Sequence, residues 1–468
     1  MTFKQHHRNQ VFLLPPSFRD FLGDGHEAVI LDEFLQELDI TDLEQSYRNE
    51  LGGSSAYHPL ILLAVLIYGY MNGIFSSRKI ATRLSQDLAF MYLAGNSKPD
   101  FRTLARFRKE KGEYLETIMA HVVQKARELG FISFGTCSLD GTKIKASASK
   151  EKNYRKDDLE KNIRSLLKEA ERLDTEEDEL YGEDNEDAED PRLKTKAGRE
   201  RRKKELKENI KKTKAKLIKL GGKTSANLTD PDARIMKMKR GNGFANAYNV
   251  QSVTENGIIL SSSISTSSAD QTALIPVIEK FKDQNGQTPK RLLADKGYSS
   301  EDNYAFCEKS GIDAYIPNYS EPTDLSRYTY DKKRDVYTDS QGHIYVFKQH
   351  MEKRDGRITR GRPRKTENKQ NQHGLYKRVI YEHRNKKTGK KKYLAVSPHW
   401  QEYVKKQKEK LSSRYGKSLY QKRMHDVEGV FANIKKNLGF TTFNLRGLAG
   451  VATEWTLISL AHNLKKVM

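Results

Sequence analysis

The stretch Arg291-Leu292-Leu293-Ala294-Asp295-Lys296-Gly297-Tyr298 decides the fold that we expect for this chain. A short apolar run ends at the carboxylate of Asp295, and Ser299 and Ser300 then offer N-cap hydroxyls for a helix. A strand holds a carboxylate at its tip rigidly, which suits a hard metal ion that takes oxygen ligands from several chain segments. The stretch therefore predicts a metal site, and we place its other carboxylates at Asp140 and Glu428.

The composition indicates a polyanionic partner. Of 468 residues, 84 are Lys or Arg and 62 are Asp or Glu, so the formal net charge is +22. A basic surplus of this size is typical of proteins that bind nucleic acid. A basic protein that is merely soluble is the alternative. The length allows about two to four domains.

No segment predicts a secreted or membrane-bound protein. The two cysteines, Cys137 and Cys307, form no Cys-x-x-Cys pair, so we expect neither a disulfide framework nor a cysteine zinc site. The N-terminus lacks an apolar signal core, and the longest apolar run, residues 59–70, is too short to span a bilayer. We therefore expect a cytoplasmic protein without a membrane partner.

Residues 1–130 predict a helical domain that contacts DNA. Pro99-Asp100 begins a basic helix over residues 101–111, after several short helices with tight turns. This arrangement resembles a helix-turn-helix-like DNA-binding unit, although a small helical bundle with a basic surface would show the same pattern. The candidate DNA contacts on the basic helix are Arg102, Arg106, Arg108 and Lys109.

Two charged segments interrupt the predicted core. Residues 151–223 hold apolar positions spaced by three and four around an acidic run, which predicts an antiparallel helical hairpin; a solvated charged insertion is the alternative. Residues 320–400 are basic and rich in tyrosine, and we interpret them as an inserted subdomain or a partly disordered loop. Within them, Arg360-Gly361-Arg362-Pro363-Arg364-Lys365 resembles an AT-hook, whose arginines enter the minor groove. We interpret Arg360, Arg362 and Arg364 as DNA contacts. The alternative to binding in the minor groove is contact with DNA phosphates in general.

The other two carboxylates lie on elements that can face a common cleft. Asp140 belongs to an extended stretch over residues 131–144, where an unpaired buried carboxylate would be costly. Strands over 244–253 and 257–265 follow as a hairpin around an Asn-Gly turn. Glu428 lies beside the apolar stripe of a later helix. The alternatives are an Asp at a strand end facing solvent and a Glu on an exposed helix face.

Taken together, these motifs resemble those of DDE transposases of bacterial insertion sequences, in the group with a helical N-terminal domain. The order and spacing of the motifs carry the resemblance, which covers most of the chain. The motifs are His58-Pro59, Tyr68-Gly69-Tyr70, Ser77-Arg78, Asp100-Phe101-Arg102-Thr103, Asp140-Gly141-Thr142-Lys143, Tyr248-Asn249-Val250-Gln251, Ala294-Asp295-Lys296-Gly297-Tyr298, Val427-Glu428-Gly429-Val430-Phe431 and Ile434-Lys435.

The resemblance implies an α/β fold. It comprises a ribonuclease-H-like mixed sheet with an all-α N-terminal domain and, read from the residues themselves, a charged helical-hairpin insertion and a basic insertion before the last catalytic helix. The implied domains are a DNA-binding domain (1–130), a catalytic core (131–150 and 224–319), the hairpin (151–223), the tyrosine-rich insertion (320–400) and C-terminal helices that complete the core (401–468).

The resemblance also implies the roles of the site residues. Asp140, Asp295 and Glu428 would be catalytic and would hold two Mg²⁺ ions, with Mn²⁺ as a possible substitute. Arg423 and Lys435, with Tyr420 and Glu428, match a Tyr-Arg-Glu-Lys pattern of the family, and either cation would contact DNA phosphate. Four residues separate Arg423 from Glu428, where the commonest form has three. The cysteine clusters of many relatives are absent from the insertion, so we expect no metal-stapled subdomain.

The implied activity is cleavage of DNA at the element ends and transfer of the cut strands to target DNA. The implied partners are double-stranded DNA, as terminal inverted repeats and target, and a second copy of the chain in a homodimer. The implied location is the bacterial cytoplasm, in association with the nucleoid. Three alternatives remain: an inactive DNA-binding derivative, a nuclease of the same fold that only hydrolyses, and a basic scaffold built around the charged hairpin.

Overall fold

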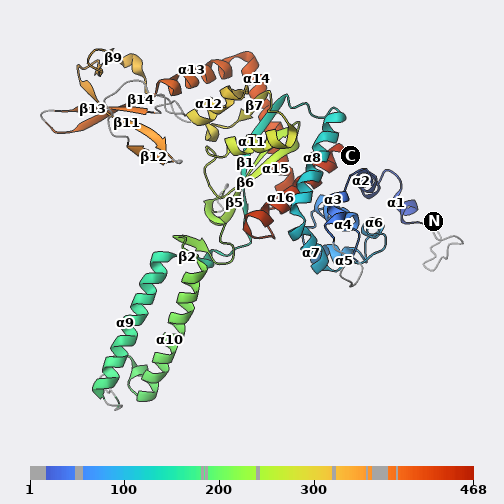
Figure 1. The fold of residues 1–468 in the computed structure, drawn as a ribbon, viewed down its shortest axis with the longest axis horizontal. Helices are drawn as coiled ribbons and strands as arrows, with labels where there is room; N and C mark the ends of the chain where they lie inside the picture. Colours follow the sequence, from blue (N-terminus) through green and yellow to red (C-terminus); the bar gives the residue numbers. More distant parts are fainter. Residues whose placement is uncertain are drawn as a thin grey trace, which may run out of the picture.

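A mixed β-sheet lies at the centre of the chain (Figure 1). The computed structural model describes residues 17–47, 56–180, 184, 188–238, 243–318, 323–354, 357–360, 378–385 and 388–468. The strand order is β4-β5-β1-β7-β8, with β6 also paired to β5. The strands are β1 (Thr136–Lys145), β4 (Arg234–Lys237), β5 (Phe244–Glu255), β6 (Ile258–Ser265), β7 (Arg291–Ala294) and β8 (Asp313–Tyr315).

The strand directions are compatible with a ribonuclease-H-like core. β5 runs antiparallel to β1, β4 and β6, whereas β7 is parallel to β1 and β8 is parallel to β7. Helix α12 (Glu301–Lys309) connects the parallel strands β7 and β8, as parallel pairing requires a crossover, and α11 (Leu274–Asn285) lies between β6 and β7. The predicted mixed α/β fold with a helical N-terminal region is thereby confirmed.

Strand β1 is shorter than predicted and is buried on both faces. The extended stretch was expected from residue 131, but residues 131–135 form a loop instead. The buried carboxylate of Glu255 holds this loop, because it accepts hydrogen bonds from the backbone N–H groups of Ser133, Phe134 and Gly135 at 2.6–3.1 Å. Residues 137–140 are all less than a tenth exposed, as in a strand covered on both sides.

The N-terminal helices share one hydrophobic core with the central sheet. The apolar sequence of α4 is buried on nearly every side, which is why it shows no amphipathic pattern. Helix α8 packs on α16 (Gly447–Val467), which in turn packs on β6. The N-terminal helices are α1 (Phe18–Leu22), α2 (Glu27–Gln36), α3 (Thr41–Gln45), α4 (Pro59–Met71), α5 (Ser77–Arg83), α6 (Leu88–Leu93), α7 (Phe101–Glu110) and α8 (Gly112–Glu128).

A buried polar triad joins the first and last helical regions. The Arg108 guanidinium donates to the Tyr70 hydroxyl at 2.8 Å and to the Phe75 carbonyl at 2.9 Å. Tyr70 donates to Glu454 at 3.1 Å, and Arg108 lies 3.7 Å from the same carboxylate. Glu454 also accepts from the backbone N–H groups of Asn444 and Leu445, which holds the turn before α16.

We expect His462 on α16 to make the stability of the fold depend on pH. Its Nε2 lies 2.9 Å from the Gly257 carbonyl and its Nδ1 lies 3.0 Å from Asn433 Nδ2, so the neutral ring donates to the first and accepts from the second. Burial lowers the pKa of His462 below its ordinary value. The unfolded chain therefore takes up a proton first as the pH falls. We expect this contribution to be complete above pH of about 6.5 and to decline below it by at most about 1.4 kcal/mol per pH unit.

A comparison with His462→Gln tests this expectation. The thermal midpoints of the two proteins should differ most at pH 8, and the difference should narrow between pH 6.5 and 5. A difference that is constant over this range would contradict the assignment of His462 as a buried neutral ring.

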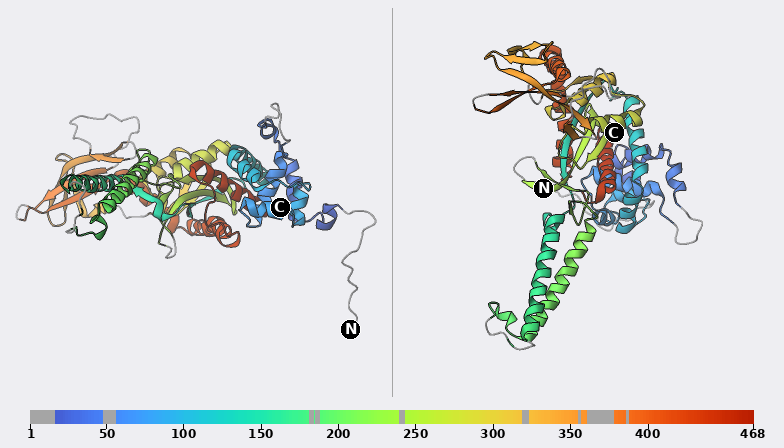
Figure 2. Two further views of the ribbon diagram at one scale, coloured as in Figure 1. Left: turned by 90° about the horizontal axis from the view of Figure 1, so that it is seen from below. Right: turned by 60° about the vertical axis from the view of Figure 1, so that its left-hand side comes forward.

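Two long helices project from the sheet, as the green pair in Figures 1 and 2. Helices α9 (Lys156–Leu180) and α10 (Lys196–Lys219) pack against each other through buried Leu173 and Leu206. Cross-helix ion pairs join Arg202 to Glu169 and Lys203 to Asp174. At their base, β2 (Asn153–Arg155) pairs with β3 (Ser225–Asn227) in an antiparallel ladder.

Residues 320–400 contain a second sheet that the sequence analysis did not predict. Its order is β14-β13-β11-β10-β9, with β12 paired to β11. Among its described residues, a small cluster of Tyr345, Tyr381, Leu394 and Val396 is buried. The strands are β9 (Tyr328–Asp331), β10 (Val336–Asp339), β11 (Ile344–Arg354), β12 (Arg357–Arg360), β13 (Arg378–Arg384) and β14 (Lys391–Val396).

The chain ends in helices that return to the central sheet. Helices α13 (Pro398–Ser412) and α14 (Arg414–Arg423) lead into a π-helical turn, Met424–Glu428. Helix α15 (Gly429–Ala432), a second π-helical turn (Asn433–Asn437) and α16 follow. Among the described residues, no helix combines the length and the apolar character needed to cross a membrane.

Candidate active site

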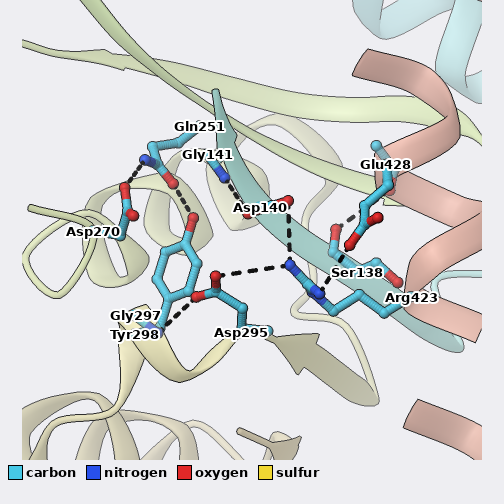
Figure 3. Close-up of polar contacts among 12 residues, drawn as sticks. Ser138, Asp140, Gly141, Gln251, Asp270, Asp295, Gly297, Tyr298, Arg423 and Glu428 are labelled. Carbon is cyan, nitrogen blue, oxygen red and sulfur yellow. Dashed lines mark hydrogen bonds and ion pairs between the residues drawn. The ribbon is translucent and has the colours of Figure 1, made fainter. Parts of the chain in front are cut away.

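Three carboxylates that lie far apart in the sequence surround one guanidinium. Arg423 Nη2 lies 3.2 Å from Asp140 Oδ2 and 3.9 Å from Asp295 Oδ2, and Arg423 Nη1 lies 3.4 Å from Glu428 Oε1. Figure 3 shows the three acidic side chains around the planar end of Arg423. The structure thus brings together the three predicted catalytic residues.

The strands and their turns fix two of these carboxylates. Asp140 lies within β1 and accepts from the Gly141 N–H at 2.8 Å. Asp295 follows β7 and caps the turn after it, because its side chain accepts from the Gly297 N–H at 2.7 Å. Tyr420 of α14 donates to the Ala294 carbonyl at 3.4 Å, which holds the helix against the end of β7.

The π-helical turn explains the unusual spacing between Arg423 and Glu428. In a π-helix, hydrogen bonds join residues five apart, so residues i and i+5 lie above one another. Arg423 and Glu428 are five apart: Arg423 directly precedes the π-helical turn and Glu428 is its last residue. The extra residue is absorbed by the wider turn, and both side chains point to the same site. Single π-helical turns within α-helices occur often at functional sites.

Arg423 keeps its charge although it is buried. Its side chain is only 9 % exposed, against 10 % for Asp140, 37 % for Asp295 and 50 % for Glu428. Burial alone would lower the pKa of Arg423, but the field of the surrounding acidic groups, Asp140 first among the carboxylates, raises it overall. The guanidinium is therefore the positive charge of the site.

A polar network beside the carboxylates includes residues to which the sequence analysis gave no role. Asn249 and Gln251 of β5 each donate to Asp270 Oδ1 at 2.8 Å. Tyr298 donates a short hydrogen bond to Gln251, as Figure 3 shows. A signal for this network exists in the sequence, because Asn249 and Gln251 are polar residues two apart and hence on one face of the strand. Both side chains are buried in the structure.

The predicted phosphate-contacting residues occupy different environments. Lys435 Nζ donates to Thr142 Oγ1 at 2.5 Å and to the Lys143 carbonyl at 2.9 Å, so it ties its helix to β1 next to the site. Arg102, Arg106 and Lys109 are exposed on α7. Arg360 ends β12, and Arg362 and Arg364 lie outside the described residues.

Arg108 does not fit the DNA contact proposed for it. It is 5 % exposed, and its guanidinium is used inside the molecule by Tyr70, Phe75 and Glu454. The reason is helical periodicity: Arg108 is one residue from the buried Phe107 and four from the buried Leu104, so it lies on the inner side of α7. A count of basic residues could not separate it from its exposed neighbours.

The site offers the ligand chemistry that a hard divalent cation takes. All three candidate ligands are carboxylates, which such a cation prefers. They converge on the guanidinium of Arg423. Within the described ranges, no group of three or more His, Cys, Asp or Glu side chains has the spacing of a metal site. Arg423 lies among the carboxylates, so the three side chains surround a guanidinium.

Two segments of the chain match known protein families. Residues 16–110 match a transposase domain (DUF772), and residues 358–468 match a transposase DDE domain. The second segment contains Arg423, Glu428 and Lys435, whereas Asp140 and Asp295 lie outside both matches. Neither a curated protein nor a solved structure matches the chain.

Proposed function

Since both transposase domains are consistent with a DDE transposase of the insertion-sequence type, we propose that this chain cuts the ends of its element and joins them to target DNA. The convergence of Asp140, Asp295 and Glu428 carries the proposal. The three acidic side chains come from a strand, the turn after a second strand and a helical segment, and together they outnumber the single guanidinium among them. Like charges placed together are costly unless a cation is bound among them.

The three carboxylates are the groups that would hold divalent metal, for which we propose two Mg²⁺ ions. When bound, the metal would activate the attacking water or DNA 3′-hydroxyl and stabilise the leaving oxygen. Asp140 is almost fully buried in β1, so it supplies a rigid inner ligand. Asp295 and Glu428 are more exposed and border the side from which DNA would approach.

The cationic residues would bind the DNA backbone rather than its bases. Arg102, Arg106 and Lys109 form an exposed group on α7, and Lys435 lies next to the carboxylates through its contacts with β1. Contacts of this kind neutralise phosphates and give binding that weakens as salt rises. We propose that two copies of the chain hold the two element ends, with terminal inverted repeats as the sequences they bind.

A cleavage assay on the DNA that flanks this reading frame tests the function. A labelled duplex with the terminal repeat should be nicked in Mg²⁺ or Mn²⁺ and remain intact in EDTA. Addition of target DNA should give joined products. Binding without nicking would favour an inactive DNA-binding derivative, and nicking without joining would favour a nuclease that only hydrolyses.

Gly141→Ala should weaken cleavage although it adds a single methyl group. A Cβ at this position would lie 2.4 Å from Gln251 Nε2 and 2.9 Å from Asp270 Oδ1, which breaks the network beside Asp140. Disruption of groups that orient metal ligands typically lowers activity about 10- to 100-fold. The initial nicking rate measures the effect. Gly25→Ala is the control, because nothing lies within 4 Å of its added Cβ, and it should cut at the wild-type rate.

A further inference from the structure

Arg423 differs from Arg108, another buried arginine, in what it contacts. Arg108 is held by a hydroxyl and a backbone carbonyl, which are fixed structural groups, in addition to one carboxylate. The ion pairs of Arg423 within the described residues are with Asp140, Asp295 and Glu428. Among the described residues, the ion pairs of this guanidinium therefore serve to neutralise the three candidate metal ligands.

We propose that Arg423 is a built-in counter-cation that divalent metal must displace, and that DNA phosphate promotes this displacement by accepting the guanidinium. The proposal rests on the proposed function, because it takes the three carboxylates as the metal site. It adds a property of the site: metal and DNA bind with positive coupling through one side chain. Metal loading is then weak until DNA is present.

The positive charge of Arg423 and its position between buried and exposed carboxylates support this coupling. A guanidinium within 4 Å of all three carboxylates removes one of their three negative charges and repels an incoming divalent cation. Asp140 is its inner partner, whereas the more exposed Asp295 and Glu428 lie toward solvent, so an outward path exists. The Nε of Arg423 is buried without a hydrogen-bond partner in the described structure, so no bond at this atom opposes the movement.

An arginine side chain can bind either the carboxylates of the site or a DNA phosphate. Its planar fork binds carboxylates in one state and phosphate in the other, and it remains charged throughout. If a phosphate removes the guanidinium from the carboxylates, the affinity for metal rises. Linkage then requires that metal raises the affinity for DNA by the same factor.

Direct measurement of Mn²⁺ binding tests the proposal without any cleavage. Free Mn²⁺ is followed by electron paramagnetic resonance during titration of the full chain in the absence of DNA. Arg423→Gln should bind Mn²⁺ at least about tenfold more tightly than the wild type, within the usual range of coupling between sites. Lys422→Gln is the matched control: it removes the same charge from the adjacent, exposed position and should change the affinity less than twofold.

A second titration includes a DNA duplex that ends at the element terminus. Because this duplex is already cut at the cleavage site, no cleavage occurs during the measurement. This DNA should tighten Mn²⁺ binding by the wild type about tenfold and change that of Arg423→Gln little. The wild-type comparison stands even if the variant fails to fold. Equal or weaker Mn²⁺ binding by a folded Arg423→Gln, or no effect of DNA on the wild type, would overturn the proposal.

A third variant separates this proposal from the proposed function. Asp140→Asn, combined with Arg423→Gln, should lose the tight Mn²⁺ binding. If binding persists in the double variant, the carboxylates are not the metal site and the proposed function loses its basis. If binding is lost in the double variant while Arg423→Gln alone binds no more tightly than the wild type, only the role of Arg423 is wrong.

Discussion

Replacing Asp295 with Asn is expected to abolish metal-dependent strand cleavage while the folded chain stays as stable as the wild type or becomes more stable. The variant loses one of three proposed metal ligands, so the attacking and leaving oxygens lose charge stabilisation worth several kcal/mol. Since each 1.4 kcal/mol is tenfold in rate, we expect a loss of about a thousandfold or more. The nicking rate on the terminal repeat measures it.

The stability of Asp295→Asn should not fall for two reasons. The substitution relieves the repulsion between Asp295 and the other two carboxylates, and it keeps the hydrogen bond that caps the turn after β7. Asp295 lies 3.9 Å from Arg423, the longest of the three ion pairs, and is partly exposed. An Asn side-chain oxygen can still accept from the Gly297 N–H. Binding of the variant to the element ends, measured in EDTA, should also be retained, since no DNA contact is proposed for Asp295.

Asp283→Asn is the matched control, because it removes the same charge from an exposed position on α11. It should leave both cleavage and thermal stability at wild-type values. Cleavage at the wild-type rate by Asp295→Asn would reject the catalytic assignment. A fall of several degrees in its thermal midpoint would instead assign Asp295 a structural role.

The two candidate ligands on or next to strands, Asp140 and Asp295, could be predicted from the local sequence. Glu428, the candidate ligand on a helix, could be predicted only in part. A carboxylate after an apolar run and before a glycine turn, as at Asp295, gives a short-range signal. Asp140 gives a similar one inside its strand. Glu428 could be placed on a helix beside the apolar stripe, but the π-helical turn that directs it toward Arg423 has no local sequence signal. The spacing from Arg423 departed from the common pattern, and only the backbone geometry accounts for it.

Buried polar partners and weakly packed strands could not be predicted. In the part of the tyrosine-rich sheet that the structure describes, the buried cluster is small, so its strands gave little of the apolar alternation that identifies most strands. The Asp270 network depends on contacts between strands β5 and β1 and the loops around them. Arg108 could be assigned to α7, but its partner Glu454 is 346 residues away in the sequence.

Replacing Arg108 with Met should lower the stability of the chain more than any other substitution considered. The side chains of Arg108 and Glu454 are 6 % and 0 % exposed, so loss of the guanidinium leaves a fully buried carboxylate without its charged partner. Removing one member of a buried ion pair typically costs about 3–5 kcal/mol. Thermal and denaturant unfolding should show a shift of this size, whereas Arg106→Met on the exposed side of the same helix should change stability by less than about 0.5 kcal/mol.

A double substitution distinguishes an unpaired charge from lost packing. In Arg108→Met with Glu454→Gln, the neutral amide can still accept from the N–H groups of Asn444 and Leu445, and no charge remains buried. We expect the double variant to recover at least about 1 kcal/mol over Arg108→Met, since residues in one network couple by about 0.5–3 kcal/mol. Additive losses would show that Arg108 acts through its hydrophobic stem alone. Because Tyr70, Arg108 and Glu454 come from α4, α7 and α16, recovery would also show that this triad couples the N-terminal helices to the C-terminal part of the core.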